Sequence, residues 1–489
     1  MHTKKYSIDK VRNYVNGEWV EPTAKEWVEI TNPATGDVLG KVPMGGAGDV
    51  DKAVAAAKAA FPAWSETPVA VRSRYLFELR NMMEQNYEEL LSICTQEHGK
   101  TYEESKGDVR RGIDNVETAA GMPTLMMGQA LEQIAGGIDC TMVRQPMGVF
   151  ACIAPYNFPS MVPLWFLPYA IASGNTFVVK PSEQVPFSQL RLFELIDKIK
   201  LPKGVVNTVN GGKDVVNGIL EHADIAGVSF VGSSPVAEHV YARCGATGKR
   251  VQALGGAKNF TTVMDDCEWD KSVANIVDSA FGCAGQRCLA TSIAVGVGPA
   301  YAKLTEKLVA AAKKIKVGNG LDEGVTMGPV ISAKHKERVL AYIEKGLAEG
   351  AKLLLDGRNY KVEGCPKGHF VGPTIFGGVT PEMTIGREEI FGPVLSVMEA
   401  KTLDDAIAMI NKHPLANASS IYTQNGTSAR TYAHKVHASM LGVNIGVAAP
   451  MSYFTFGGAK GSFLGDLKAH GTESALFYTQ NKTTIARWW

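Results

Sequence analysis

One cysteine of this chain stands in a setting that suits a nucleophile. Cys288 ends the run Phe281-Gly-Cys-Ala-Gly-Gln-Arg-Cys and directly follows a permanent cation, Arg287. A cysteine attacks as its thiolate, and a neighbouring guanidinium or free backbone N–H groups lower the pKa of the thiol. The sequence therefore predicts Cys288 as the reactive group. The alternative is that Cys288 is one more buried small residue, and only partners elsewhere in the chain can decide between the two.

The elements that would position this residue follow an alternating pattern. Short β-branched runs alternate with helical segments from Gly148 to Leu254, and a second alternation follows Gly255. This pattern predicts two units of parallel strands joined by right-handed crossovers, that is, doubly wound sheets that bind ligands at the carboxyl ends of their strands. Cys288 lies on the loop after the first predicted helix of the second unit. The predicted strands span 149–154, 176–180, 205–209, 226–231 and 250–254 in the first unit, and 260–264, 352–355, 419–422 and 441–445 in the second.

The predicted strand ends of the first unit carry polar residues that suit a nucleotide. Lys180 and Glu183 follow the second strand and could hold ribose hydroxyls, while Gly232 and Ser233 follow the fourth strand and open a helix. A helix N-terminus offers unpaired N–H groups to a phosphate. The fingerprint G-x-G-x-x-G is absent, and each signal alone is also typical of a plain cap or a solvated turn. Their joint placement at successive strand ends predicts a nucleotide site.

The rest of the chain is predicted to be helical at first and β-rich at its end. Helical spacing covers 49–61, 69–98 and 101–121, and the third of these helices carries Arg110 and Arg111 side by side. A ribbon is predicted over 129–145, and 475–485 reads as a strand without a partner nearby in the sequence. An unpaired terminal strand needs a cover. We therefore expect an exchange of strands between subunits that involves the ribbon.

Composition limits the possible partners. The chain has 489 residues, a net charge of +1, 45% hydrophobic and 20% charged residues, so two or three globular domains are expected, with no nucleic acid and no membrane as partners. The start lacks a signal or transit pattern, which predicts a cytoplasmic protein. Its eight cysteines include no C-x-x-C pair, so free thiols in a reducing compartment are expected. Neither the cysteines nor the histidines have ligand spacing, so no metal is predicted.

Seven ordered motifs resemble those of the NAD(P)-dependent aldehyde dehydrogenase superfamily. They are Pro155-Tyr-Asn-Phe-Pro, Val179-Lys-Pro-Ser-Glu, Phe230-Val-Gly-Ser, Leu254-Gly-Gly-Ala-Lys-Asn, Phe281-x-x-x-Gly-Gln-x-Cys, Glu389-Ile-Phe-Gly-Pro and Phe456-Gly-Gly-x-Lys. The resemblance implies an α/β fold of two doubly wound parallel-sheet domains with a β-flap for oligomerisation. The implied parts are an NAD-binding domain over 1–127 and 148–254, a catalytic domain over 255–446, and a flap over 128–147 and 447–489.

The resemblance also implies roles for single residues. It makes Cys288 the nucleophile, with Asn157 and the Cys288 backbone N–H as donors to an oxyanion. The implied cofactor contacts are Phe158 near the reaction centre, Lys180 and Glu183 for the adenosine ribose, Gly232 and Ser233 for the pyrophosphate, and Glu389 and Phe391 for the ribose on the nicotinamide side. A carboxylate such as Glu183 would repel a 2′-phosphate, so NAD is expected in preference to NADP.

One departure from the family pattern points to a subclass. Hydrolytic members carry a glutamate before Gly-Gly that activates water, and the matching position here is Ala253. Without that base, water attack on a Cys288 thioester should be slow, whereas a thiol such as coenzyme A needs no strong base. In this respect, and in Ala459-Lys-Gly-Ser-Phe-Leu-Gly-Asp466 and Phe477-Tyr-Thr-Gln-x-Lys-Thr483, the chain resembles the CoA-acylating methylmalonate/malonate-semialdehyde dehydrogenases. That resemblance implies decarboxylation to acetyl-CoA or propionyl-CoA.

A small anionic aldehyde needs a cationic partner, which an arginine supplies. Arg111 and Arg287 are the candidates, in preference to Arg110; the alternative for Arg110 and Arg111 is a solvated helix face paired with acidic neighbours. Two other functions stay open. One is a hydrolytic dehydrogenase for a sulfonated or succinic semialdehyde, and the other is a non-catalytic descendant of the fold. The sequence does not distinguish malonate from methylmalonate semialdehyde, or a homodimer from a homotetramer.

Overall fold

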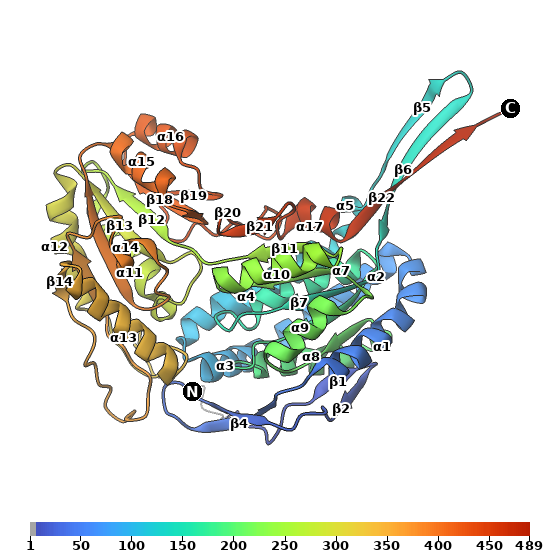
Figure 1. Ribbon diagram of the computed structural model, residues 1–489, viewed down its shortest axis with the longest axis horizontal. Coiled ribbons are helices and arrows are strands. Elements are labelled where there is room, and N and C mark those ends of the chain that lie inside the picture. Colours follow the sequence, from blue (N-terminus) through green and yellow to red (C-terminus); the bar gives the residue numbers. More distant parts are fainter. Residues whose placement is uncertain (1–5) are drawn as a thin grey trace.

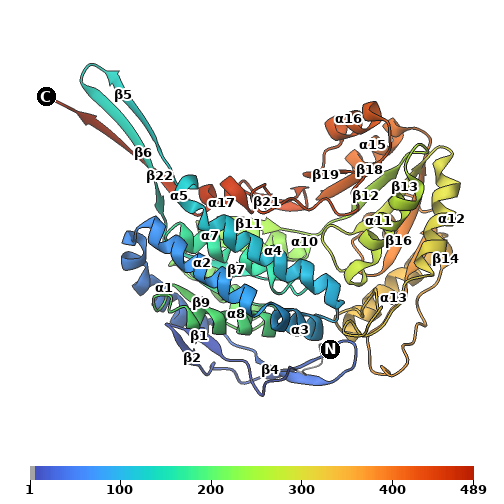
Figure 2. The same ribbon diagram turned by 180° about the vertical axis from the view of Figure 1, so that it is seen from behind.

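The computed structural model describes residues 6–489 and consists of two α/β lobes and a long β-arm that projects from the first lobe (Figure 1). The two lobes face each other across the molecule, with the end of the chain running back over the first lobe before it enters the arm (Figures 1 and 2). Within residues 6–489, none of the helices combines the length and the apolar character that crossing a membrane requires.

The first lobe is built on an eight-stranded sheet with a doubly wound core. Strands β7 to β11 are parallel in the order β9-β8-β7-β10-β11, so the chain winds outward from β7 in both directions. This reversal creates a switch point at the carboxyl ends of β7 and β10, where such sheets bind ligands. From one edge to the other the strands are β2 (Glu18–Val20), β1 (Asn13–Val15), β9 (Val206–Thr208), β8 (Thr176–Lys180), β7 (Val149–Ile153), β10 (Ile225–Val231), β11 (Arg250–Leu254) and β21 (Phe463–Gly465).

The second lobe holds a seven-stranded sheet, parallel except at the β14 edge. Its strands are β14 (Lys352–Leu355), β15 (Thr374–Gly377), β16 (Val394–Ala400), β13 (Thr291–Val297), β12 (Asn259–Val263), β18 (Ala418–Tyr422) and β19 (Met440–Val443). The two α/β units predicted from the sequence are confirmed. Strands β13, β15 and β16 were not predicted, because a short buried run is hard to tell from a helix segment by its pattern.

Helices cover both faces of each sheet. On the first sheet α2 and α4 lie over one face (Figure 2) and α9 and α10 over the other (Figure 1). The helices are α1 (Ala47–Glu66), α2 (Val69–Gln85), α3 (Tyr87–His98), α4 (Tyr102–Ala120), α5 (Met122–Leu125), α6 (Met161–Leu164), α7 (Leu167–Ala172), α8 (Phe187–Lys198), α9 (Lys213–Glu221), α10 (Ser234–Ala246), α11 (Trp269–Phe281), the 3-10 turn η1 (Gly282–Gly285), α12 (Ala300–Ala312), α13 (Ala333–Ala348), α14 (Thr384–Arg387), α15 (Leu403–Lys412), α16 (Gly426–Lys435) and α17 (Gly471–Phe477). Two small sheets pair β3 (Trp27–Thr31) with β4 (Val38–Pro43) and β17 (Leu415–Ala416) with β20 (Ala459–Lys460).

The single helix predicted over 69–98 is two helices. Asn86 interrupts it with φ −111° and ψ 19°, and the Asn86 side chain donates a hydrogen bond to the Met82 carbonyl at 2.7 Å. An asparagine side chain competes in this way with the helical ladder. The break lets α3 leave the direction of α2 and continue toward α4.

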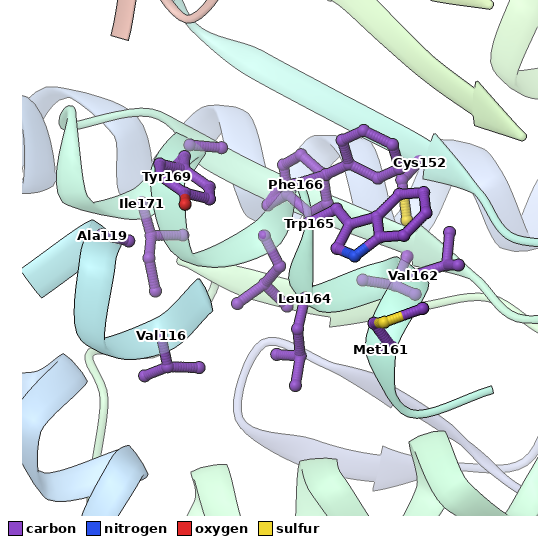
Figure 3. Close-up of a cluster of buried hydrophobic side chains, with 14 of the residues drawn as sticks. Val116, Ala119, Cys152, Met161, Val162, Leu164, Trp165, Phe166, Tyr169 and Ile171 are labelled. Carbon is purple, nitrogen blue, oxygen red and sulfur yellow. The ribbon is translucent and has the colours of Figure 1, made fainter. Parts of the chain in front are cut away.

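The segment after β7 forms the core that supports the switch point. Figure 3 shows its side chains from Met161 to Ile171 gathered with Val116 and Ala119 of α4, and all of them are buried. Trp165 and Phe166 have ring centroids 6.3 Å apart. Buried aromatic area of this kind fixes the backbone that precedes it, which is the turn with Asn157 and Phe158.

The arm is a three-stranded antiparallel sheet of β5 (Gln129–Ala135), β6 (Ile138–Pro146) and β22 (Thr479–Arg487). Strand β22 pairs with β6 of the same chain, so the expected exchange of strands between subunits is wrong on this point. Within one chain, the β5–β6 ribbon lies beside the terminal strand β22, and β6 pairs with it. Residues 447–478, placed in the flap by the sequence, lie outside the arm, since β21 joins the first sheet and α17 packs on α7.

Candidate active site

A cavity of about 380 Å³ lies between the lobes and has Cys288 in its wall. Five segments contribute to it: helix α4, the turn and short helix after β7, Asp278 of α11, the loop after η1, and the 447–470 segment. Arg111, Arg287 and Phe158, three of the residues singled out from the sequence, line the same cavity. The fold therefore brings the predicted nucleophile and both predicted arginines to one enclosed space.

The loop that carries Cys288 is held by close backbone contacts. Gly285 has φ 71°, and a Cβ there would come within 2.1 Å of the Gly392 carbonyl oxygen, so only glycine fits. The Cys288 carbonyl accepts hydrogen bonds from the side-chain amides of Asn259 and Asn417, each at 2.9 Å. These contacts come from the second sheet, and they fix the direction in which the thiol points.

Burial makes the Cys288 thiol a weak acid in the free chain. Burial first and the nearby Glu389 carboxylate second raise the pKa of Cys288 to about 12, while Arg287 lowers this pKa by a smaller amount. The guanidinium of Arg287 is directed elsewhere, with its Nε 3.3 Å from the Cys283 Sγ and a terminal nitrogen 3.4 Å from Glu104. Arg287 thus lowers the pKa of Cys288, as expected, but burial outweighs this adjacent cation.

Asn157 reaches the cysteine loop from the turn after β7. It is buried, and its side-chain Nδ2 donates to the Gln286 carbonyl at 3.1 Å, which places the amide beside the loop that presents Cys288. An amide nitrogen carries a further N–H for a ligand oxygen. The Asn157 carbonyl accepts from Lys100 Nζ at 2.7 Å, and the same ammonium lies 4.1 Å from the Phe158 ring centroid. The Lys100 ammonium thus contacts both residues of the turn, Asn157 and Phe158.

The arginines differ in how far their charge is compensated. Arg110 turns away from the cavity and donates two hydrogen bonds to Glu84, at 2.5 and 3.0 Å. Arg111 lines the cavity, and its nearest hydrogen-bond acceptor among residues 6–489 is the Pro450 carbonyl at 3.4 Å. Arg287 also lines the cavity but is engaged by acidic neighbours. Arg111 is therefore the guanidinium best able to pair with a ligand carboxylate.

The expected nucleotide contacts lie at the carboxyl edge of the first sheet. Lys180 ends β8 and donates to Glu183 at 2.7 Å. Burial opposes ionisation of this carboxyl, but the Lys180 ammonium holds the pKa of Glu183 below its ordinary value, so Glu183 is an anionic acceptor. Ser233 is the N-cap residue of α10, and its side chain makes no capping bond. Its hydroxyl and the Ser234 N–H are available to an anion, whereas Pro235 has no N–H and the Val236 N–H donates to the Ser233 carbonyl at 3.1 Å.

Gly232 plays a different part from the one expected. Its N–H donates to the Leu254 carbonyl at 3.0 Å, so this group belongs to the sheet and is not offered to a phosphate. A Cβ at Gly232 would come within 2.4 Å of the Phe230 ring. A glycine is needed here because the chain passes over the Phe230 ring as it enters α10. Gly232 lies where the sequence predicted it, but its N–H is not free for a phosphate.

Glu389 and Phe391 stand between the two lobes. The Glu389 carboxylate accepts from the Ala257 N–H at 3.0 Å, just after β11. Burial raises the pKa of Glu389 to about 7, against the lowering effect of that bond. Phe391 has φ 60°, and its ring lies 5.9 Å edge-on from Tyr156, which precedes Asn157. The segment with Glu389 and Phe391 therefore contacts both the loop after β11 and the turn after β7. Glu389 is also close enough to Cys288 to affect the pKa of the thiol.

The residue that faces the thiol side of β11 is Leu254 and not Ala253. Ala253 packs with Phe230 and Val240 on the face covered by α9 and α10. Leu254 belongs to the core on the other face, against which Cys288 packs. Neighbouring strand residues point to opposite faces, so the sequence match was one residue off in space. Neither side chain can accept a proton, so the expectation that this strand supplies no base still holds.

Several site residues were not found from the sequence. Glu104, Trp165, Phe456 and His470 line the cavity. Two of them had a signal: Phe456 begins the motif Phe456-Gly-Gly-x-Lys, and Glu104 closes the capping box Thr101-x-x-Glu104 at the start of α4, which the structure shows with both reciprocal hydrogen bonds. The others come from segments distant in the chain. Cys283 is buried, and its Sγ accepts a hydrogen bond from Arg287 Nε at 3.3 Å.

Comparison with known proteins places this site in a family context. Residues 19–484 match the model of the Aldehyde dehydrogenase family. A malonate-semialdehyde dehydrogenase of Geobacillus thermodenitrificans is 52% identical over 482 residues, which are 98% of this chain and 99% of that protein. The crystal structure of a methylmalonate-semialdehyde dehydrogenase from Oceanimonas doudoroffii superposes with a TM-score of 0.96 at 42% identity, covering 98% of this chain and 99% of that one. A Sinorhizobium meliloti structure complexed with NAD, provisionally given the same enzyme name, has a TM-score of 0.97 at 41% identity and covers 99% of both chains.

The coupling between Glu389 and Cys288 can be tested by alkylation. Replacing Glu389 with Gln removes a charge that raises the thiol pKa, so at pH 8 iodoacetamide should modify Cys288 about 3- to 10-fold faster than in the parent. The pKa of Glu389 is about 7, so the parent carboxylate gains its proton as the pH falls through this value, and the difference should shrink below pH 6. Mass spectrometry of the Cys288 peptide measures the rate.

The matched control for this experiment is Glu388→Gln. The Glu388 carboxylate accepts from the Tyr342 hydroxyl at 2.7 Å, away from the thiol, so this change should leave the rate as it is. An E389Q rate no higher than the parent rate at pH 8, or an equal gain at pH 5.5 and pH 8, would contradict the coupling.

Proposed function

The chain belongs to the aldehyde dehydrogenase family, and on this premise we propose that it oxidises malonate semialdehyde or methylmalonate semialdehyde with NAD and transfers the acyl group to coenzyme A. The single observation that carries the proposal is the shared cavity of Cys288 and Arg111. A thiol at one side and a guanidinium without an ion-pair partner among residues 6–489 at another suit an aldehyde that bears a carboxylate. The names of the similar proteins support this substrate class.

The residues at the carboxyl edge of the first sheet fit NAD. Glu183 is ionised beside Lys180 and can accept from the adenosine ribose hydroxyls, whereas a 2′-phosphate would meet its negative charge. Ser233 and the N-terminus of α10 suit the pyrophosphate, and Glu389 with Phe391 suits the second ribose. When bound, NAD supplies a hydride acceptor. The NAD complex of the Sinorhizobium meliloti protein supports the assignment.

The protein's own groups account for capture of the aldehyde. Burial keeps the Cys288 thiol neutral, so its sulfur attacks the carbonyl carbon as the thiol proton passes to water, and the electrons of the C=O π bond move onto the oxygen. We propose that the second amide N–H of Asn157 and the backbone N–H of Cys288 donate to the resulting alkoxide. Loss of one such donor costs about 10²–10³-fold in rate. Oxidation of this adduct leaves an acyl thioester on Cys288.

Release of the acyl group from Cys288 depends on whether a neighbouring side chain can activate water. Leu254 faces this side of the sheet and cannot activate water. A second thiol can exchange with the thioester without a strong base, so coenzyme A is proposed as the acyl acceptor. Loss of CO₂ from the acyl group sends electrons into an enolate that the same amide donors can stabilise. The expected product is acetyl-CoA from malonate semialdehyde, or propionyl-CoA from the methylated substrate.

A hydrolytic dehydrogenase for another anionic aldehyde, such as a sulfonated or succinic one, is the second candidate. The observation that favours it is Glu389, whose pKa of about 7 would suit a general base near Cys288. The Ala257 bond holds one oxygen of this carboxylate, and the other is free to act. Dependence on coenzyme A separates the two candidates.

The assay follows NADH with malonate semialdehyde and NAD, with and without coenzyme A. Without coenzyme A, NADH should appear as a burst of about one equivalent per Cys288 and then nearly stop, because the thioester has no acceptor. With coenzyme A, turnover should continue and acetyl-CoA should form. Desulfo-coenzyme A, which lacks the thiol, is the matched control and should not restore turnover. Equal steady rates with and without coenzyme A would favour the hydrolytic candidate.

We also propose that the protein works in the cytoplasm as a homodimer or homotetramer assembled through the arm. All eight cysteines are free, which supports a reducing compartment. On one face of the arm, Leu131, Cys140 and Ile485 form a row across its three strands. Leu131 is 65% and Ile485 67% exposed, and such a strip of apolar side chains needs a cover.

Replacing Ile485 with Arg should lower the molar mass in solution, measured by light scattering during gel filtration. The charge would be buried in the proposed contact, and an unpaired buried charge weakens an interface strongly. Thr484→Arg is the matched control, since Thr484 lies on the opposite face of the same strand beside Thr141. If I485R assembles like the parent, or if T484R dissociates to the same extent, the apolar row is not the contact.

A further inference from the structure

A buried histidine without partners lies in the wall of the active-site cavity. His470 precedes α17, is 3% exposed, and lines the cavity that holds Cys288 and Arg111. Among residues 6–489, neither ring nitrogen of His470 has a hydrogen-bond partner. Buried polar atoms are nearly always paired, so an unpaired imidazole in a cavity wall needs an explanation.

Aromatic contacts fix the position of this ring. The His470 centroid is 5.1 Å from Trp165, 5.4 Å from Phe456 and 6.5 Å from Tyr169. Trp165 and Tyr169 belong to the buried cluster of Figure 3, so the imidazole rests on the rigid core behind the switch point. These neighbours hold the ring by its edges and faces but satisfy neither nitrogen, and both nitrogens are buried without a hydrogen-bond partner among residues 6–489.

The backbone at His470 is strained. Its φ is 74° and its ψ 163°, a region that only glycine adopts without cost. The next residue, Gly471, also has a positive φ, of 54°. Of these two positions with a positive φ, only the second is a glycine. A side chain with a Cβ is nevertheless held here. Strained residues of this kind cluster at functional sites, where the surrounding structure imposes the conformation.

Arg111 adds a charge beside this ring. Burial first and the Arg111 guanidinium second lower the pKa of His470 to about 3, so the imidazole is neutral at physiological pH. A neutral imidazole has one donor and one acceptor nitrogen. The guanidinium itself has a single long contact, to the Pro450 carbonyl at 3.4 Å. Arg111 and His470 line the same cavity, and neither forms a hydrogen bond or ion pair with a carboxylate of residues 6–489, although the Asp114 carboxylate in the same wall acts to raise the pKa of Arg111.

We propose that His470 is a specificity-determining residue, whose imidazole N–H donates a hydrogen bond to the substrate carboxylate that pairs with Arg111. The inference rests on the proposed function, because it needs a substrate with a carboxylate. The two donors come from different elements, Arg111 from α4 and His470 from the segment before α17, and a carboxylate has an oxygen for each. The imidazole then selects anionic aldehydes whose chain is short enough to reach both Cys288 and this pair.

The test compares two aldehydes of equal chain length, malonate semialdehyde and propanal, with NAD and coenzyme A present. The measured quantity is the ratio of their kcat/KM values. In His470→Phe, which keeps an aromatic ring but has no donor, this ratio should fall about 10- to 100-fold, mainly through KM for malonate semialdehyde. His470→Gln keeps an N–H donor and should hold the ratio within about 3-fold of the parent.

Two arginine variants calibrate the measurement. Arg111→Met should lower the same ratio, and Arg110→Met should not, since Arg110 is bonded to Glu84 outside the cavity. Thermal unfolding of each variant checks the fold, and His470→Leu replaces H470F if the larger ring does not fold.

The outcomes separate this inference from the proposed function. If the parent enzyme uses propanal as well as malonate semialdehyde, the proposed function fails. If the parent prefers the anionic aldehyde and R111M loses that preference while H470F keeps it, the proposed function stands and the role of His470 is overturned. An equal loss of both activities in H470F would assign His470 to packing and would also overturn the inference.

Discussion

A buried ion pair between Lys100 and Asp108 holds the site together. Their charged atoms are 2.9 Å apart, and both side chains are fully buried. Lys100 also donates to the Asn157 carbonyl at 2.7 Å, and Asp108 accepts from the Met161 N–H at 2.7 Å and from the Cys94 thiol at 3.2 Å. Removing one member of such a pair leaves an uncompensated charge and costs about 3–5 kcal/mol. The pair is therefore a strong constraint, and it acts directly on the turn that carries Asn157.

The same helix extends this constraint to the second lobe. Glu104, Asp108 and Arg111 stand at i, i+4 and i+7 on α4, which places them along one face. Glu104 accepts from the Cys283 N–H and pairs with Arg287, Asp108 fixes the turn after β7, and Arg111 enters the cavity. One helix face thus contacts the loop before Cys288 and the turn with Asn157, and it also carries Arg111. A shift of α4 would move all of them together.

The sequence predicted the parts of the site that depend on local pattern. Strand ends mark Lys180, Ser233 and Asn157, because parallel strands bring their carboxyl ends to one edge whatever the side chains do. The acidity of Cys288 could not be predicted in this way. It depends on burial and on Glu389, which is distant in the chain, and the neighbouring Arg287 suggested the opposite result. The side of β11 that faces the thiol required the register of the sheet, and an error of one residue exchanged Leu254 for Ala253. No local sequence pattern marked His470, because the feature that singles it out, two ring nitrogens without hydrogen-bond partners, exists only in the folded structure.

The proposed chemistry rests on an acyl group carried by one sulfur and passed to another. The direct measurement is acid quenching of the enzyme after mixing with malonate semialdehyde and NAD in the absence of coenzyme A, followed by mass spectrometry of the Cys288 peptide. We expect an acyl adduct on Cys288 that persists without coenzyme A and moves to coenzyme A when it is added. NADH formation with Cys288 unmodified, or an adduct that water removes as fast as coenzyme A does, would contradict transfer from sulfur to sulfur.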